Sequence, residues 1–85
     1  MNDNRLKEFI KEEVNLSLAS GFMIECLANR FDVSEKVIDE LVDSTVEHVT
    51  DVIYNNMDNN FKRHLHRIIM QEVEKYMQQE IKKQK

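Results

Sequence analysis

Apolar side chains recur every three or four residues along most of this chain, which is the spacing of one buried face of an α-helix. The pattern is clearest over residues 33–54, where apolar positions gather on one side and acidic positions on the other. Asp32 is suited to cap the start of this helix, and Glu35 is placed to complete a capping box. The pattern therefore predicts a long amphipathic helix over about 33–54.

Similar spacing predicts three more helices, over about 3–19, 22–30 and 61–83. The apolar positions that recur along the first of them are Leu6, Phe9, Ile10, Val14 and Leu18. Ser20 and Gly21 interrupt the pattern after it, and Gly favours the backbone conformation that ends a helix. Residues 55–60 are rich in Asn, which is typical of a turn, so the last two helices should fold back on each other. We expect one all-α domain of four helices across residues 1–85, ending in a long antiparallel hairpin.

Residues 24–42, IECLANRFDVSEKVIDELV, place a small residue, Ala28, before a short turn and an apolar residue, Val33, after it. The other apolar positions of this segment are Leu27, Phe31, Val37, Ile38 and Leu41. This arrangement resembles a helix-turn-helix motif, in which the small residue lies where the two helices cross. Asp32 stands where the family's turn usually has Gly, and Asp is able to adopt the left-handed backbone conformation needed there. The resemblance implies a helix-turn-helix-like N-terminal bundle.

The exposed side of the motif's second helix is acidic. In DNA-binding members of the family these positions meet base edges and phosphates, but here Lys36 is the one cation among them. Such a surface suits a partner that itself presents Lys and Arg, although a solvated outer face is the commoner explanation of a charge run. The acidic partner surface that we expect consists of Glu35, Asp39, Glu40, Asp43 and Glu47. DNA reading by this helix is the second hypothesis.

Charge is distributed unevenly along the chain. Residues 1–60 contain 5 Lys or Arg and 13 Asp or Glu, whereas residues 61–85 contain 7 and 3. A basic last helix therefore follows an acidic body, within a net charge of −4. Antiparallel packing predicts that Lys82, Lys83 and Lys85 lie near the acidic start of the third helix and partly neutralise it.

A second basic cluster, Lys62, Arg63 and Arg67, lies at the start of the last helix. Cations at a helix N-terminus oppose the helix dipole, so acids nearby or an anionic partner should compensate them. Asp51 and Asp58 are the internal partners that we expect, and contact with nucleic acid or another anion is the alternative.

Met70, Met77 and Ile81 extend the apolar surface of the last helix beyond what a single partner helix would cover. Methionine suits adaptable contact surfaces. Two interpretations are open, a homodimer interface at these residues and a wider intramolecular core.

The side chains that usually carry chemistry are not arranged for it. His64 and His66 lie about 200° apart around a helix, and Cys26 has no companion cysteine, whereas zinc needs three or four converging ligands. We expect surface histidines, a buried Cys26, and no metal or cofactor. No serine lies in a Gly-rich elbow and no Gly-rich loop could hold a nucleotide, so we expect no catalytic residue, no small-molecule substrate and no enzyme.

Composition narrows the class further. The chain has no Pro, one Gly and 33% charged residues, which is typical of solvated helices. No apolar run approaches the roughly 18 residues that cross a bilayer, and a single cysteine favours the cytoplasm. The function that we expect is a small regulatory or interaction protein that binds another protein, as a homodimer. The alternatives are a helix-turn-helix DNA-binding transcriptional regulator and an oligomeric phage packaging or scaffold component.

Overall fold

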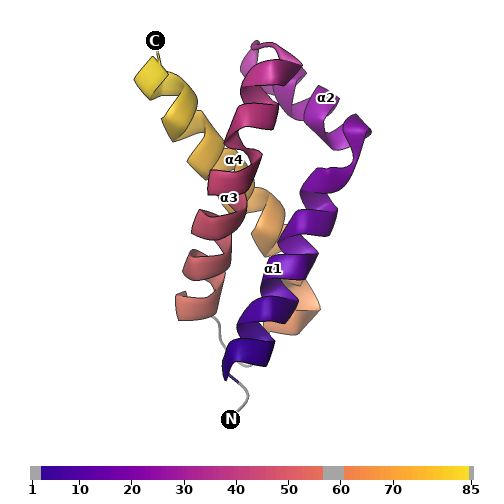
Figure 1. Ribbon diagram of the computed structural model, residues 1–85, viewed down its shortest axis with the longest axis vertical. Helices are drawn as coiled ribbons and strands as arrows, with labels where there is room; N and C mark the ends of the chain where they lie inside the picture. The colour runs from indigo at the N-terminus through magenta and orange to yellow at the C-terminus, as the bar shows by residue number, and fades with distance from the viewer. Residues whose placement is uncertain (1–2, 57–60, 85) are drawn as a thin grey trace.

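A computed structural model describes residues 3–56 and 61–84, and side chains within 5–56 and 63–83 (Figure 1). Its helices are α1 (Asp3–Ala19), α2 (Gly21–Phe31), α3 (Glu35–Asn56) and α4 (Leu65–Gln84), and the 3₁₀ turn η1 (Phe61–His64) precedes α4. The described part of the chain contains no strand, which confirms the predicted all-α fold.

Three helices run lengthwise and α2 crosses one end of them (Figure 1). The chain rises along α1, descends along α3 and rises again along α4, so α3 and α4 form the predicted antiparallel hairpin. α3 packs extensively against both α1 and α4, whereas α1 and α4 contact each other over a shorter stretch. α3 is therefore the central helix, and the space between α1 and α4 is less completely closed.

The corner between α2 and α3 depends on Asp32. Its backbone is in the left-handed conformation, with φ 57° and ψ 49°. The N–H groups of Asp32 and Val33 donate to the carbonyls of Asn29 and Ala28 at 3.3 and 3.0 Å, which satisfies carbonyl groups at the end of α2. Asp32 thus closes α2.

The start of the third helix differs from the prediction. Asp32 was expected to cap a helix beginning near Val33. Its left-handed backbone conformation is incompatible with the start of a right-handed helix, and α3 begins at Glu35. Ser34 takes the capping role, since its side-chain oxygen accepts a hydrogen bond from the N–H of Val37 at 3.4 Å.

All four helices contribute to one hydrophobic core. Its members are Ile10, Val14, Leu18, Leu27, Ala28, Ile38, Leu41, Val46, Val49, Ile53, Leu65, Ile69, Val73, Met77 and Ile81. The core residues from α3 lie on the apolar side that its periodicity predicted. On α4 the buried positions follow one another every fourth residue, so the buried stripe drifts by about 40° at each step around the helix. Such a winding stripe fits the diagonal course of α4 behind the other helices (Figure 1).

The placement of the α4 methionines decides between the two interpretations of its extra apolar surface. Met77 is 0% exposed and Ile81 is 6% exposed within a single chain, and Met70 is half-buried against the same core. A homodimer interface at Met77 and Ile81 is therefore wrong, because the other helices already cover these side chains. The wider intramolecular core is correct.

Candidate functional site

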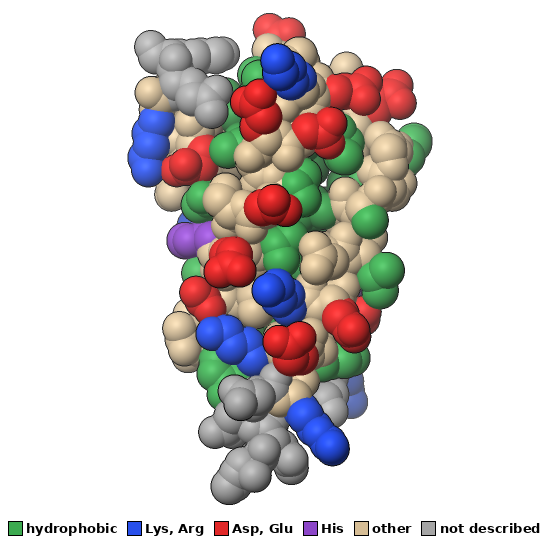
Figure 2. Space-filling model, viewed as in Figure 1, with side chains coloured by type: hydrophobic (Ala, Val, Ile, Leu, Met, Phe, Trp, Pro, Cys, Tyr) green, Lys and Arg blue, Asp and Glu red, His purple; other side chains and the backbone are tan. Residues whose placement is uncertain are grey.

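The acidic residues of α3 face solvent. Glu35, Asp39, Glu40, Asp43 and Glu47, called here the acidic face, are all exposed. Helical geometry places them there, because Ile38 and Leu41, between them in sequence, turn into the core. Figure 2 shows acidic side chains spread along α3 on the near side of the molecule. The acidic face is thus a row of carboxylates on a helix whose opposite side is held by packing.

Two ion pairs join one half of α3 to α1. Lys11 Nζ lies 3.5 Å from Glu47 Oε1, and Lys7 Nζ lies 3.0 Å from Asp51 Oδ1. The hydrogen bond to Asp51 and the attraction of that carboxylate raise the pKa of Lys7 above its ordinary value. Asp51 was expected to pair with the basic start of α4, but among the described side chains it pairs with Lys7 of α1. Asp58, the other expected partner, lies outside the described residues.

The first half of the acidic face is not neutralised in this way. None of the ion pairs among described side chains involves Glu35, Asp39, Glu40 or Asp43. The result is a local excess of negative charge along the outer side of α3.

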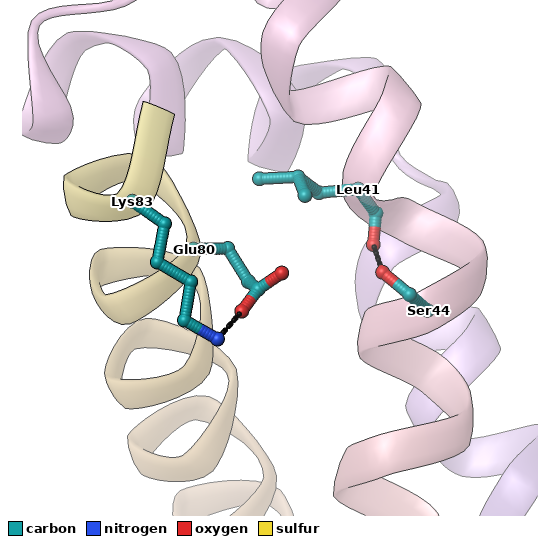
Figure 3. Close-up of polar contacts among 4 residues, drawn as sticks. All are labelled: Leu41, Ser44, Glu80 and Lys83. Atoms are coloured by element: carbon teal, nitrogen blue, oxygen red, sulfur yellow. Dashed lines mark hydrogen bonds and ion pairs between the residues drawn. The ribbon is translucent and has the colours of Figure 1, made fainter. Parts of the chain in front are cut away.

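Lys82 and Lys83, the described C-terminal lysines of α4, form no ion pair with α3. Lys83 Nζ pairs with Glu80 Oε2 of its own helix at 2.9 Å, which raises the pKa of Lys83 above its ordinary value. Lys82 is exposed, and Lys85 lies outside the described residues. At this level α3 presents Leu41 and Ser44, whose hydroxyl donates to the Leu41 carbonyl at 3.2 Å (Figure 3). α4 also diverges from α3 toward its C-terminus, which is why its lysines bond locally (Figure 1).

The predicted basic cluster is divided by the structure. Arg63 and Arg67 are both exposed, but Arg63 lines a hollow of about 510 Å³ between α1 and the start of α4, and Arg67 does not. The side chain of Lys62 lies outside the described residues. The full lining of the hollow is Phe9, Glu13, Leu16, Ser17, Arg63, Leu65, His66 and Ile69. A surface that combines both helices was not predicted.

Three large apolar side chains are unexpectedly exposed. Phe9 is 41% exposed, Leu16 69% and Phe22 72%. Phe9 was grouped with the apolar face of α1, but it lies at the edge of that face. Leu16 lies off the apolar stripe of α1, and this departure from the helical pattern was the signal that could have found it. Phe9 and Leu16 both line the hollow beside α4.

The residues that could bind metal are dispersed. His48, His64 and His66 are exposed, as predicted, and the ring of His48 stacks on Tyr76 with centroids 4.4 Å apart. Cys26 is exposed and not buried, because α2 turns its neighbours Leu27 and Ala28 inward. Among the described residues no group of three or more His, Cys, Asp or Glu side chains is placed to hold a metal ion.

None of the described helices combines the length and the apolar character that crossing a membrane requires. Comparison with known proteins yields no matching family model, no matching curated protein and no matching solved structure.

Proposed function

We propose that this chain is a non-enzymatic interaction protein that binds a basic protein partner through the acidic face of α3. The observation that carries the proposal is the exposed row of Glu35, Asp39, Glu40 and Asp43, which no described cation neutralises. Charged surfaces of one sign steer an oppositely charged partner and select against partners of the same charge.

The spacing within this row supports binding. Residues 35, 39 and 43 follow one another every four positions, so neighbouring carboxylates lie about 6 Å apart along one side of the helix. Like charges at this spacing disfavour the helix that carries them, and a bound cationic partner removes that penalty. Because the opposite side of α3 is buried in the core, the row keeps its geometry before the partner arrives.

DNA binding is the second candidate, and the α2–α3 corner favours it. Ala28 is 4% exposed and Asp32 is left-handed, as in the turn of a helix-turn-helix motif. The charges oppose this reading. Arg30 pairs with Glu74 of α4, and Lys36 is the one cation on the outer side of the first two turns of α3. A protein partner is therefore our first choice, and the exposed thiol of Cys26 supports a reducing, cytoplasmic setting for it.

A matched pair of triple variants tests the proposal. Asp39→Asn, Glu40→Gln and Asp43→Asn together remove three charges from the acidic face, and Glu8→Gln, Glu12→Gln and Glu25→Gln remove three exposed charges elsewhere. From nuclease-treated host lysate, the wild type and the second variant should capture the same basic protein, and the first variant should lose it. Binding of the purified partner should weaken with added salt. Equal capture by both variants would contradict the proposal.

A DNA mobility-shift experiment distinguishes the DNA-binding candidate from the protein-binding one. A mixed-sequence duplex should not be shifted by the wild type at physiological salt if the acidic face is the binding surface. A shift that weakens when Arg63 and Arg67 are changed to Ala would favour DNA instead, since each lost phosphate contact reduces the salt dependence of binding.

A further inference from the structure

The hollow between α1 and α4, called the α1–α4 groove from here on, has an apolar centre. Leu65 and Ile69 of α4 form its floor and are 7% and 1% exposed, while Phe9 and Leu16 of α1 line it at 41% and 69% exposure. The two helices that bound it contact each other over a shorter stretch than either contacts α3. Exposed apolar side chains beside an incompletely closed groove are typical of a contact surface.

The two walls of this groove carry opposite charges. Glu13 lines it from α1, and Arg63 of η1 lines it from the α4 side. No ion pair among the described side chains joins Glu13 to Arg63. A partner of uniform charge would meet repulsion at one wall, whereas a second copy of the same surface is able to satisfy both.

Symmetry decides how two copies fit. A twofold axis along the groove places the α1 wall of each copy against the α4 wall of the other. Glu13 of one copy then faces Arg63 of the other, and the same contact recurs across the axis. A twofold axis across the groove would oppose acid with acid and base with base, which is unfavourable.

We propose that a second copy of this chain covers the α1–α4 groove, in a dimer whose twofold axis runs along it. Phe9 and Leu16 form the apolar centre of the interface, and the Glu13–Arg63 pairs form its rim. This interface lies on α1 and α4, apart from the acidic face of α3, so it goes beyond the proposed function and fails or succeeds independently of it. The groove is lined by eight residues, fewer than the roughly 20 to 30 residues per partner of a standard interface, so we expect a weak dimer.

Charge exchange between two chains tests the proposal directly. Glu13→Arg alone and Arg63→Glu alone should each weaken self-association about tenfold or more, because each opposes like charges at both ends of the interface. An equimolar mixture of the two variants should form a heterodimer about as tight as the wild-type dimer, since both cross-contacts are then opposite in sign. Sedimentation equilibrium from about 10 µM to about 1 mM measures all three.

A second pair of variants distinguishes association through the groove from nonspecific association through any exposed apolar side chain. Leu16→Asp should abolish association, and Phe22→Asp, which changes an equally exposed side chain on α2 outside the groove, should leave it unchanged. Circular dichroism checks that each variant keeps its helices. A wild type that stays monomeric throughout this range, a mixture no tighter than its components, or equal loss in both Asp variants would overturn the proposal.

Discussion

The two sides of α1 differ in how completely the neighbouring helices cover their apolar side chains. On the core side, Ile10, Val14 and Leu18 are at most 1% exposed, and Lys7 and Lys11 pair with carboxylates of α3. On the side toward α4, Phe9 and Leu16 remain exposed beside a hollow. α3 follows α1 closely, whereas α4 crosses behind it, so only the first side is sealed within one chain (Figure 1). Apolar character alone therefore does not show what a residue packs against.

Two leucines of α1, two positions apart, should give the largest difference in unfolding free energy between the two sides. Leu18→Ala should lower the free energy of unfolding by about 3 kcal/mol, because it removes a buried side chain and leaves a cavity. Leu16→Ala should change it by less than about 0.5 kcal/mol. Urea unfolding at low protein concentration, where a dimer contributes little, measures both. Similar losses for the two variants would mean that the groove is closed in the monomer.

The methionines of α4 show the same contrast between fully buried and partly exposed apolar side chains. Met77→Ala should cost about 2 to 3 kcal/mol, since Met77 is fully buried, and Met70→Ala should cost about 1 kcal/mol, since it is half-buried. Thermal unfolding of the two variants provides the comparison. If Met77→Ala weakened dimerisation while leaving the monomer's stability unchanged, the assignment of Met77 to the core would be refuted.

The buried threonines offer a smaller effect of the opposite sign. Thr50 is 2% exposed, and its hydroxyl has no hydrogen-bond partner among the described residues. Thr50→Val should therefore raise the free energy of unfolding by about 1 kcal/mol, because an unpaired buried hydroxyl is replaced by a methyl group. Thr50→Ser is the control, since it keeps the hydroxyl and loses the methyl, and it should destabilise. A loss of stability in the Val variant would show that the hydroxyl is bonded in solution.

The smallest effect is expected at the ion pair between α1 and α3. Lys7→Gln should lower stability less than the core substitutions above, because the pair is exposed, and salt should reduce the difference from wild type. The pKa of Lys7 is raised in the folded state, so its contribution is complete below the ordinary value of 10.5 and is lost as pH rises through the raised value. Chemical unfolding at pH about 7 and at alkaline pH above 10.5 should show that the difference shrinks as pH rises.

Local patterns predicted much of the site because they act within one helix. The apolar period of α3 placed its acids on the outer side, and the three histidines were correctly expected at the surface. The N-cap of α3 was predicted wrongly because Asp suits both ends of a helix. Asp32 closes α2 in a left-handed backbone conformation, and this conformation prevents it from capping the start of α3. The groove could not be predicted, since its walls come from segments about fifty residues apart in sequence.

By itself, the sequence determined where the helices lie, which side of α3 is acidic and that the last two helices form a hairpin. The tertiary structure alone decided that Met77 and Ile81 are buried, that Leu16 and Cys26 are exposed, and that α1 supplies the cations paired with Glu47 and Asp51. The physical reason is that helical periodicity sets which residues share a face. Which faces are covered depends on how the helices cross, and that depends on contacts between distant segments.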